Sequence, residues 1–148
     1  MIERSSALPP VEAWRRLTAW ERHGATVPLT RIDVLTPPPS GPGTVFVART
    51  GVGRVGFADP MRVTEWRPPG TDGGPGHCRL EKTGRLVTGW AEIEVRPDPA
   101  GDGAGSRVTW REDLRVWRLP GLFDGVTSRS GRFVFGRAVD TLLRTPAG

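Results

Sequence analysis

Six segments with the residue content of β-strands follow one another in the middle of the chain, with no helical segment between them. Turn formers separate the segments, as in the proline- and glycine-rich stretch 37–43. The predicted strands are 31–36, 44–52, 54–66, 77–86, 88–96 and 107–117. The third is expected to be broken near Asp59-Pro60, where the missing amide of proline suits a bulge or an edge. Consecutive parallel strands need a crossover of a dozen or more residues, whereas antiparallel strands need only a turn. The pattern therefore predicts an antiparallel meander.

The segment before these strands has a different pattern. Residues 2–7 form a short predicted strand, and the apolar spacing after them predicts a helix at 10–19. Pro10 fits the first position of that helix, where a missing N–H does no harm. A second short helix at 20–24 is expected to end at Gly24.

The end of the chain, 128–144, carries the clearest helical period. Its apolar face consists of Phe135, Ala138, Val139, Leu142 and Leu143. The same face carries only small side chains, Ser128 and Gly131, one to two turns earlier. We therefore predict an α+β domain whose sheet of six or seven strands is covered by this helix. The bulky half of the helix would anchor the core, and the small half would border a cavity.

Length and composition fit one globular domain spanning 1–148, with 145–148 as a flexible tail. No apolar run approaches the roughly 20 residues that cross a bilayer, and the N-terminus lacks the apolar core of a secretion signal. Cys78 is the only cysteine, which fits a reducing compartment. We expect a cytoplasmic protein, monomeric or homodimeric, that does not insert into membranes.

The formal net charge of +5 raises the question of nucleic-acid binding. Lys82 is the only lysine among 21 basic side chains, and the chain contains no Asn, Gln or Tyr. This bias is typical of a GC-rich genome. The arginines are scattered and interleaved with acidic residues, and no aromatic and basic RNA-binding strand motif is present. We expect no nucleic-acid partner.

The stretch 51–56 matches the G-x-G-x-x-G pattern of dinucleotide-binding loops. That function requires a helix directly after the glycines, with its N-terminus at the pyrophosphate. An extended segment follows instead, so the glycines indicate a hairpin turn. The two histidines, His23 and His77, are far apart and lack second ligands at metal spacing. We expect neither a cofactor nor a metal.

Glu112 is the sharpest candidate for chemistry. Alternation places it on the same strand face as Val108, Trp110 and Leu114, where a carboxylate must be paired, hydrated or functional. The same rule puts Glu65 and Lys82 on apolar faces. A Glu112–Lys82 pair or a Glu112–arginine pair inside a cavity would orient a polar ligand group. The alternative is a bulge that shifts the strand by one residue and exposes Glu112.

His23 is a second candidate, because it lies where the short helices give way to the sheet, at an expected cavity mouth. The alternative is a surface residue near a helix C-terminus. The tryptophans at 14, 66, 90, 110 and 117 either stack on a flat ligand or belong to the core. Cys78 is expected to be a small buried hydrophobe.

The pattern resembles the START-related superfamily, often labelled SRPBCC or polyketide cyclase/dehydrase-like. The resemblance rests on the stretches 8–14, 21–24, 27–30, 57–69 and 106–113. It covers nearly the whole chain, although its motifs are diffuse. It implies a helix-grip fold, in which a curved antiparallel sheet wraps around a long C-terminal helix. A hydrophobic cavity between them would bind a small molecule, but fold alone does not determine activity.

Three functions remain open. The first is binding of a small hydrophobic or aromatic, polyketide-like molecule. The second is a cyclase, aromatase or dehydratase in which Glu112 and His23 move protons. The third is an interaction domain with a vestigial pocket. The expected ligand-binding residues are Trp110, Glu65, Lys82, Ala91, Ser128, Gly131 and Phe135.

Overall fold

The structure is a computed structural model that describes residues 1–100, 104–117 and 136–144. One antiparallel sheet of seven strands dominates it, in the order β1-β7-β6-β5-β4-β3-β2. The strands are β1 (Ile2–Ser6), β2 (Thr30–Val34), β3 (Val45–Val52), β4 (Val55–Arg67), β5 (Gly76–Thr83), β6 (Val87–Pro97) and β7 (Ser106–Val116). Strands β2 to β7 are neighbours in chain order, so the predicted meander is confirmed.

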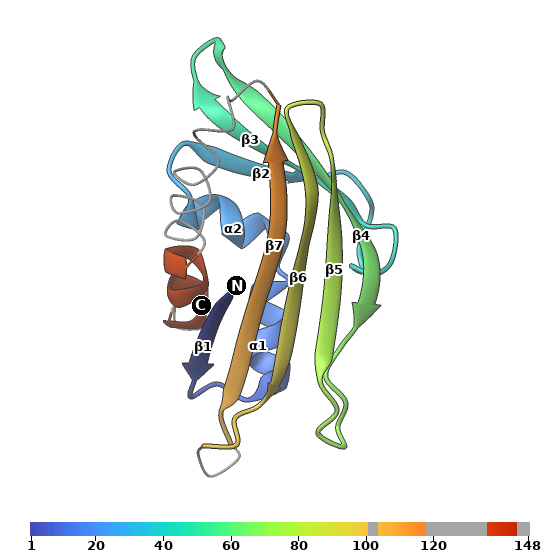
Figure 1. Ribbon diagram of the computed structural model, residues 1–148, viewed down its shortest axis with the longest axis vertical. Helices are drawn as coiled ribbons and strands as arrows, with labels where there is room; N and C mark the ends of the chain where they lie inside the picture. Colours follow the sequence, from blue (N-terminus) through green and yellow to red (C-terminus); the bar gives the residue numbers. More distant parts are fainter. Residues whose placement is uncertain (101–103, 118–135, 145–148) are drawn as a thin grey trace.

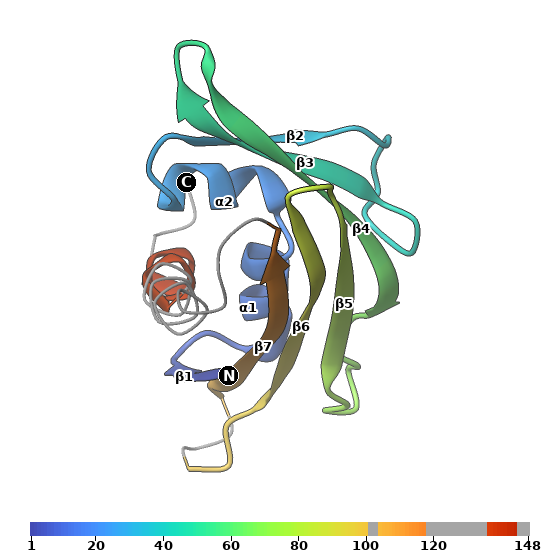
Figure 2. The ribbon, with the colours of Figure 1, turned by 45° about the horizontal axis from the view of Figure 1, so that its top comes forward.

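The sheet is strongly curved, and all helical segments lie on its concave side (Figures 1 and 2). Two short helices, α1 (Pro10–Leu17) and α2 (Trp20–Thr26), follow β1. Residues 136–144 form a C-terminal helix, which lies across the concavity beside α2 and β1 (Figure 2). The predicted α+β helix-grip architecture is therefore confirmed.

The helical face predicted from the sequence is buried where the structure describes it. The buried side chains are Ala138, Val139, Leu142 and Leu143, while Arg137, Thr141 and Arg144 are exposed. Asp140 lies at the edge of the buried face and accepts a hydrogen bond from Arg4 Nε of β1 at 2.7 Å. This ion pair connects strand β1, near the N-terminus, with the C-terminal helix. Ser128, Gly131 and Phe135 lie outside the described residues.

Aromatic side chains fill the core beneath α1 and α2. Trp20 stacks on Phe46 of β3, with ring centroids 4.7 Å apart and planes inclined by 12°. Trp14 meets Trp66 of β4 edge to face at 5.1 Å. Both helices therefore pack on the sheet through large aromatic rings. Burial of these rings stabilises the fold by several kcal/mol in total.

The glycine motif at 51–56 is a hairpin turn, as predicted. Val52 and Val55 are the last paired residues of β3 and β4, and Gly53 in the turn has a φ of 59°. A Cβ atom on Gly51 would lie 2.4 Å from the carbonyl oxygen of Val55, so only glycine fits there. No helix follows the motif, which removes the structural basis for dinucleotide binding.

Strand β4 differs from the expectation in one important respect. It runs without interruption through Asp59 and Pro60, where a break was expected. Pro60 lies beyond the last residue pair between β4 and β5, Met61↔Lys82. The irregularity occurs instead between Val63 and Glu65, where the register with β5 shifts. The side chains of β4 change faces at that point.

Helix α2 also runs two residues past Gly24, to Thr26. No helix in the described part of the chain is long and apolar enough to cross a membrane.

Candidate functional site

A cavity of about 380 Å³ lies between the concave face of the sheet, α2 and the C-terminal helix. Its wall is mostly apolar. The described lining residues are Trp20, His23, Val27, Thr30, Ile32, Ala48, Thr50, Phe57, Asp59, Met61, Leu80, Lys82, Ala91, Trp110, Glu112 and Ala138. Most of them come from the strands of the curved sheet, and the rest come from α2, from Val27 just after it and from the C-terminal helix. The curvature of the sheet therefore creates the cavity.

Glu112 lines the cavity, as alternation along β7 predicted. The register between β6 and β7 is continuous from Val87↔Val116 to Pro97↔Ser106, so no bulge moves Glu112 to the outer face. Trp110 Nε1 donates a hydrogen bond of 3.3 Å to Glu112 Oε2. Ala91 is the β6 partner of Glu112 and is buried in the same wall. The small Ala91 side chain leaves space in front of the carboxylate.

His23 belongs to the cavity wall and not to the outer surface. Its Nε2 donates a hydrogen bond to the Leu17 carbonyl oxygen at 2.7 Å, because a carbonyl can only accept. The imidazole ring lies near the rings of Trp20 and Trp110, at centroid distances of 5.8 and 6.2 Å. Burial lowers the pKa of His23, against the opposing effect of the Leu17 hydrogen bond. Near neutral pH the lowered pKa favours the neutral imidazole, and the hydrogen bond to Leu17 places its one N–H on Nε2.

Lys82 also lines the cavity, but its partner differs from the predicted one. Lys82 Nζ donates a hydrogen bond to Asp59 Oδ2, whereas a pair with Glu112 was expected. The Lys82 side chain is 6% exposed and that of Asp59 is 10% exposed. Two opposite charges thus lie in contact inside an otherwise apolar wall.

Asp59 was missed in the sequence because Asp59-Pro60 was interpreted as a strand break. Simple alternation through Phe57, Asp59 and Met61 would have placed all three in the wall, where the structure has them. Thr30, Thr50 and Trp20 were also missed, because no sequence signal showed which strand ends border the cavity.

Glu65 is not part of this site. The register shift after Val63 turns Glu65 outward, so its expected place on the inner face is wrong. Its side chain is 60% exposed, and Oε2 lies 3.4 Å from His77 Nδ1. Trp66 takes the inward position and packs against the core. The other expected ligand-binding residues, Ser128, Gly131 and Phe135, fall outside the described residues.

Trp110 is the only one of the five candidate tryptophans among the described lining residues. Trp14 and Trp66 belong to the core. Trp90 lies on the outer face, where the Arg79 guanidinium covers its ring at 4.6 Å, and Trp117 is exposed. Trp20, which was not a candidate, supplies the second tryptophan of the wall.

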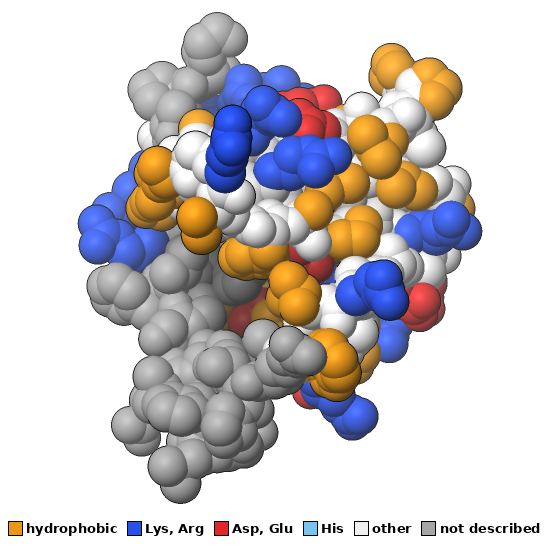
Figure 3. Space-filling view, turned by 90° about the horizontal axis from the view of Figure 1, so that it is seen from above, with side chains coloured by type: hydrophobic (Ala, Val, Ile, Leu, Met, Phe, Trp, Pro, Cys, Tyr) orange, Lys and Arg blue, Asp and Glu red, His pale blue; other side chains and the backbone are white. Residues whose placement is uncertain are grey.

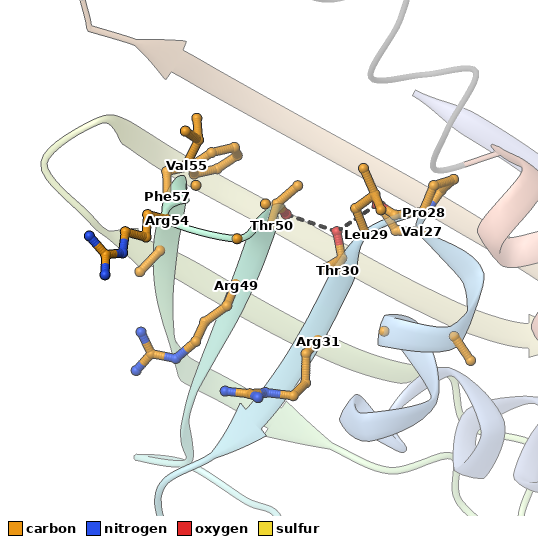
Figure 4. A pocket seen from close by; sticks show the side chains of 16 residues that line it. Val27, Pro28, Leu29, Thr30, Arg31, Arg49, Thr50, Arg54, Val55 and Phe57 are labelled. Carbon is orange, nitrogen blue, oxygen red and sulfur yellow. Dashed lines mark hydrogen bonds between the residues drawn. The ribbon is translucent and has the colours of Figure 1, made fainter.

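An outer groove adjoins the cavity at the end of the molecule formed by the β3–β4 hairpin (Figure 4). Val27, Thr30, Thr50 and Phe57 line both spaces. The Thr30 and Thr50 hydroxyl oxygens are hydrogen-bonded at 2.8 Å and form part of the partition between them. Apolar and basic side chains mix over this end (Figure 3).

The groove is lined by exposed apolar side chains, including Leu29 and Val55, and by Arg31, Arg49 and Arg54. Asp33 forms ion pairs with Arg31 at 2.9 Å and with Arg49 at 2.8 Å. These exposed pairs are screened by water and stabilise the fold little.

The described residues contain no group of three or more His, Cys, Asp or Glu side chains arranged to hold a metal ion. Among the described lining residues, the polar groups are His23, Glu112, the Lys82–Asp59 pair, two threonines and the indole N–H groups. They can accept, donate or move a proton at the edge of an apolar ligand.

No protein-family model and no curated protein sequence matches the chain. Solved structures do match. Ara h 8.0201, a Bet v 1-like member of the START-related superfamily, superposes over 97% of this chain and 96% of its own, with a TM-score of 0.60 and 14% identity. TTHA0849 from Thermus thermophilus superposes over 97% of this chain and 90% of its own, with a TM-score of 0.64 and 15% identity. The chain has the helix-grip fold of the START-related SRPBCC superfamily.

Proposed function

We propose that the protein binds one small, largely apolar molecule in the cavity between the sheet and the C-terminal helix. The cavity wall carries the proposal: it is formed by Trp20, Trp110 and aliphatic side chains, with a few polar groups converging on it. Its volume of about 380 Å³ lies in the range of small-molecule sites. The Bet v 1-like fold of the structural neighbours is known for hydrophobic ligand binding, which supports the same proposal.

Filling the cavity tests this function. Ala91→Phe places a benzyl side chain into the wall opposite the helices, and binding of the neutral fluorescent probe N-phenyl-1-naphthylamine should weaken at least roughly tenfold. Ala7→Phe is the matched control, because Ala7 is exposed just after β1. Circular dichroism checks the fold of each variant, and Ala48→Phe fills the same cavity from β3 if Ala91→Phe does not fold. Equal probe binding by wild type, Ala91→Phe and Ala48→Phe would contradict the proposal.

The presence of His23 and Glu112 in the wall of the same mostly apolar cavity favours a second function. We propose as the alternative an enzyme of the cyclase, aromatase or dehydratase type, acting on a polyketide-like substrate. The unprotonated Nδ1 of His23 would accept a proton, and Glu112 would exchange a proton with a substrate oxygen. An enclosed cavity would hold the reacting carbons close together.

Turnover of a candidate poly-carbonyl substrate separates the two functions. Glu112→Gln and His23→Ala should each reduce the rate of an enzyme by roughly two or more orders of magnitude. If both variants turn over the substrate at the wild-type rate, the acid–base mechanism fails and the binding function remains. His77→Ala is the control, because His77 does not line the cavity.

A further inference from the structure

Lys82 is placed unusually for a lysine. It is the only lysine of the chain and lies on the inner face of β5, next to the buried Leu80. Its ammonium group donates to Asp59 Oδ2 and lies 3.5 Å from Met61 Sδ, a weak acceptor. An ammonium group carries three hydrogens, so one has no acceptor among the contacts of the described residues. Because Lys82 lines the cavity, this N–H group is part of the cavity wall.

The ion pair between Lys82 and Asp59 is not an effective way to stabilise the fold. Moving two charges out of water carries a desolvation penalty, and the mutual attraction repays it only when the remaining hydrogen bonds are satisfied. Asp59 Oδ1 is enclosed by protein and makes no hydrogen bond in the described part of the structure. A well-packed apolar pair would stabilise the fold as well or better. The position of these two charges in a mostly apolar cavity wall therefore points to a role toward a ligand.

We infer that the Lys82–Asp59 pair is the polar anchor of the cavity and selects apolar ligands that carry an uncharged carbonyl oxygen. The carbonyl accepts the third hydrogen of Lys82 Nζ, while the apolar body packs against Trp110, Ala91 and Leu80. This inference rests on the proposed binding function.

The charges in the cavity wall explain why we expect the acceptor oxygen of the ligand to be uncharged. Asp59 neutralises Lys82, so the pair presents a directed N–H group without a net positive charge. Glu112 adds a second carboxylate to the same wall. A ligand carboxylate would lose its hydration in the apolar cavity and would find no net positive charge in this pair to compensate for that loss. A neutral carbonyl gains the hydrogen bond at a smaller desolvation penalty.

Matched probes test the selection. 2-Acetylnaphthalene and 2-isopropenylnaphthalene have nearly the same shape, but only the first has a carbonyl oxygen. The wild type should bind the ketone roughly tenfold more tightly than the hydrocarbon, the effect of one hydrogen bond from a charged donor. 2-Naphthoate should bind more weakly than the ketone. Isothermal titration calorimetry gives all three dissociation constants.

The double variant Asp59→Leu/Lys82→Met removes both charges together. It avoids the buried unpaired carboxylate that Lys82→Met alone would leave, and such a carboxylate could prevent folding. We expect it to be as stable as the wild type or more stable, and the ketone-to-hydrocarbon affinity ratio should fall to about one. The matched control is Arg79→Met/Glu92→Leu, an ion pair between β5 and β6 that does not line the cavity. Its affinity ratio should equal that of the wild type.

A direct readout comes from the single lysine. Labelling with 15Nζ-lysine gives one side-chain resonance, which the ketone should shift more than the hydrocarbon. Equal affinities for the two probes, with equal shifts, would overturn the anchor and leave the binding function intact. Tighter binding of 2-naphthoate than of the ketone would overturn the preference for an uncharged acceptor. Failure of all three probes to bind would contradict the binding function itself.

Discussion

Burial of the His23 ring makes the stability of the fold depend on pH. The pKa of His23 is lowered in the folded protein, so below the ordinary value of about 6.5 the unfolded chain binds a proton that the folded protein does not. The contribution of His23 to the free energy of unfolding is fully present above that pH and is lost as the pH falls toward the pKa of the folded state. The carboxyl groups with lowered pKa, such as Asp98, act at more acidic pH.

The corresponding prediction concerns the slope of stability against pH. Between about pH 7 and 5 the free energy of unfolding of the wild type should fall by up to about 1.4 kcal/mol per pH unit from this group. His23→Gln should flatten this dependence. Urea denaturation at a series of pH values measures it. An unchanged slope in His23→Gln would contradict the buried, neutral imidazole.

Cys78 provides a second test at the scale of a residue. Its side chain is 0% exposed, and burial, followed by the charge of Glu65, raises the pKa of the thiol to about 12. Because the thiolate is the reactive form, the native protein should not react with Ellman's reagent at about pH 8. The denatured chain should react at once with one equivalent. Rapid labelling of the native protein would show that the core beneath α1 opens locally.

Alternation along single strands predicted part of the wall correctly. It placed Lys82, Ala91, Trp110 and Glu112 on the inner face, because strands β5 to β7 hold their side-chain period through those positions. It failed for Glu65, because the register shift in β4 has no sequence signal. The sequence alone could not predict contacts between side chains of different strands, because the contact of Lys82 with Asp59 depends on how neighbouring strands align.

The order of the elements was more predictable than the contacts between them. Strand periodicity and the glycine- and proline-rich turns identified every strand of the sheet, because each signal is local. The described part of the C-terminal helix buries the face that its period predicts. Its position over the concave sheet follows from the need to cover the apolar face, which the two short helices cover only in part.

Leu142 tests the grip of that helix on the sheet. Leu142 is buried in the core together with Val139 and Leu143. Leu142→Ala should lower the free energy of unfolding by about 2–5 kcal/mol, through lost burial and the cavity left behind. Arg144→Ala, at an exposed position of the same helix, should change it by no more than about 0.5 kcal/mol. Urea denaturation compares the two, and equal values would mean that the helix is not packed as described.

At the scale of the whole molecule, the curvature of the sheet connects sequence to function. Side chains from the inner faces of strands β2 to β7 line one cavity, and α2 and the C-terminal helix form the rest of its described wall. Both helices lie on the concave side of the sheet (Figure 2). Structures that share only 14% and 15% identity with this chain have the same fold, so the fold does not depend on one particular sequence. The fold by itself does not determine the function.

Native mass spectrometry of freshly purified protein shows directly whether the cavity holds a ligand. We expect a non-covalent mass increment of one small molecule on the wild type, or one equivalent of N-phenyl-1-naphthylamine when the probe is added. The increment should be lost in folded Ala91→Phe and kept in Ala7→Phe. Wild-type protein that shows only the mass of the bare chain, with and without the probe, would contradict a ligand-binding cavity.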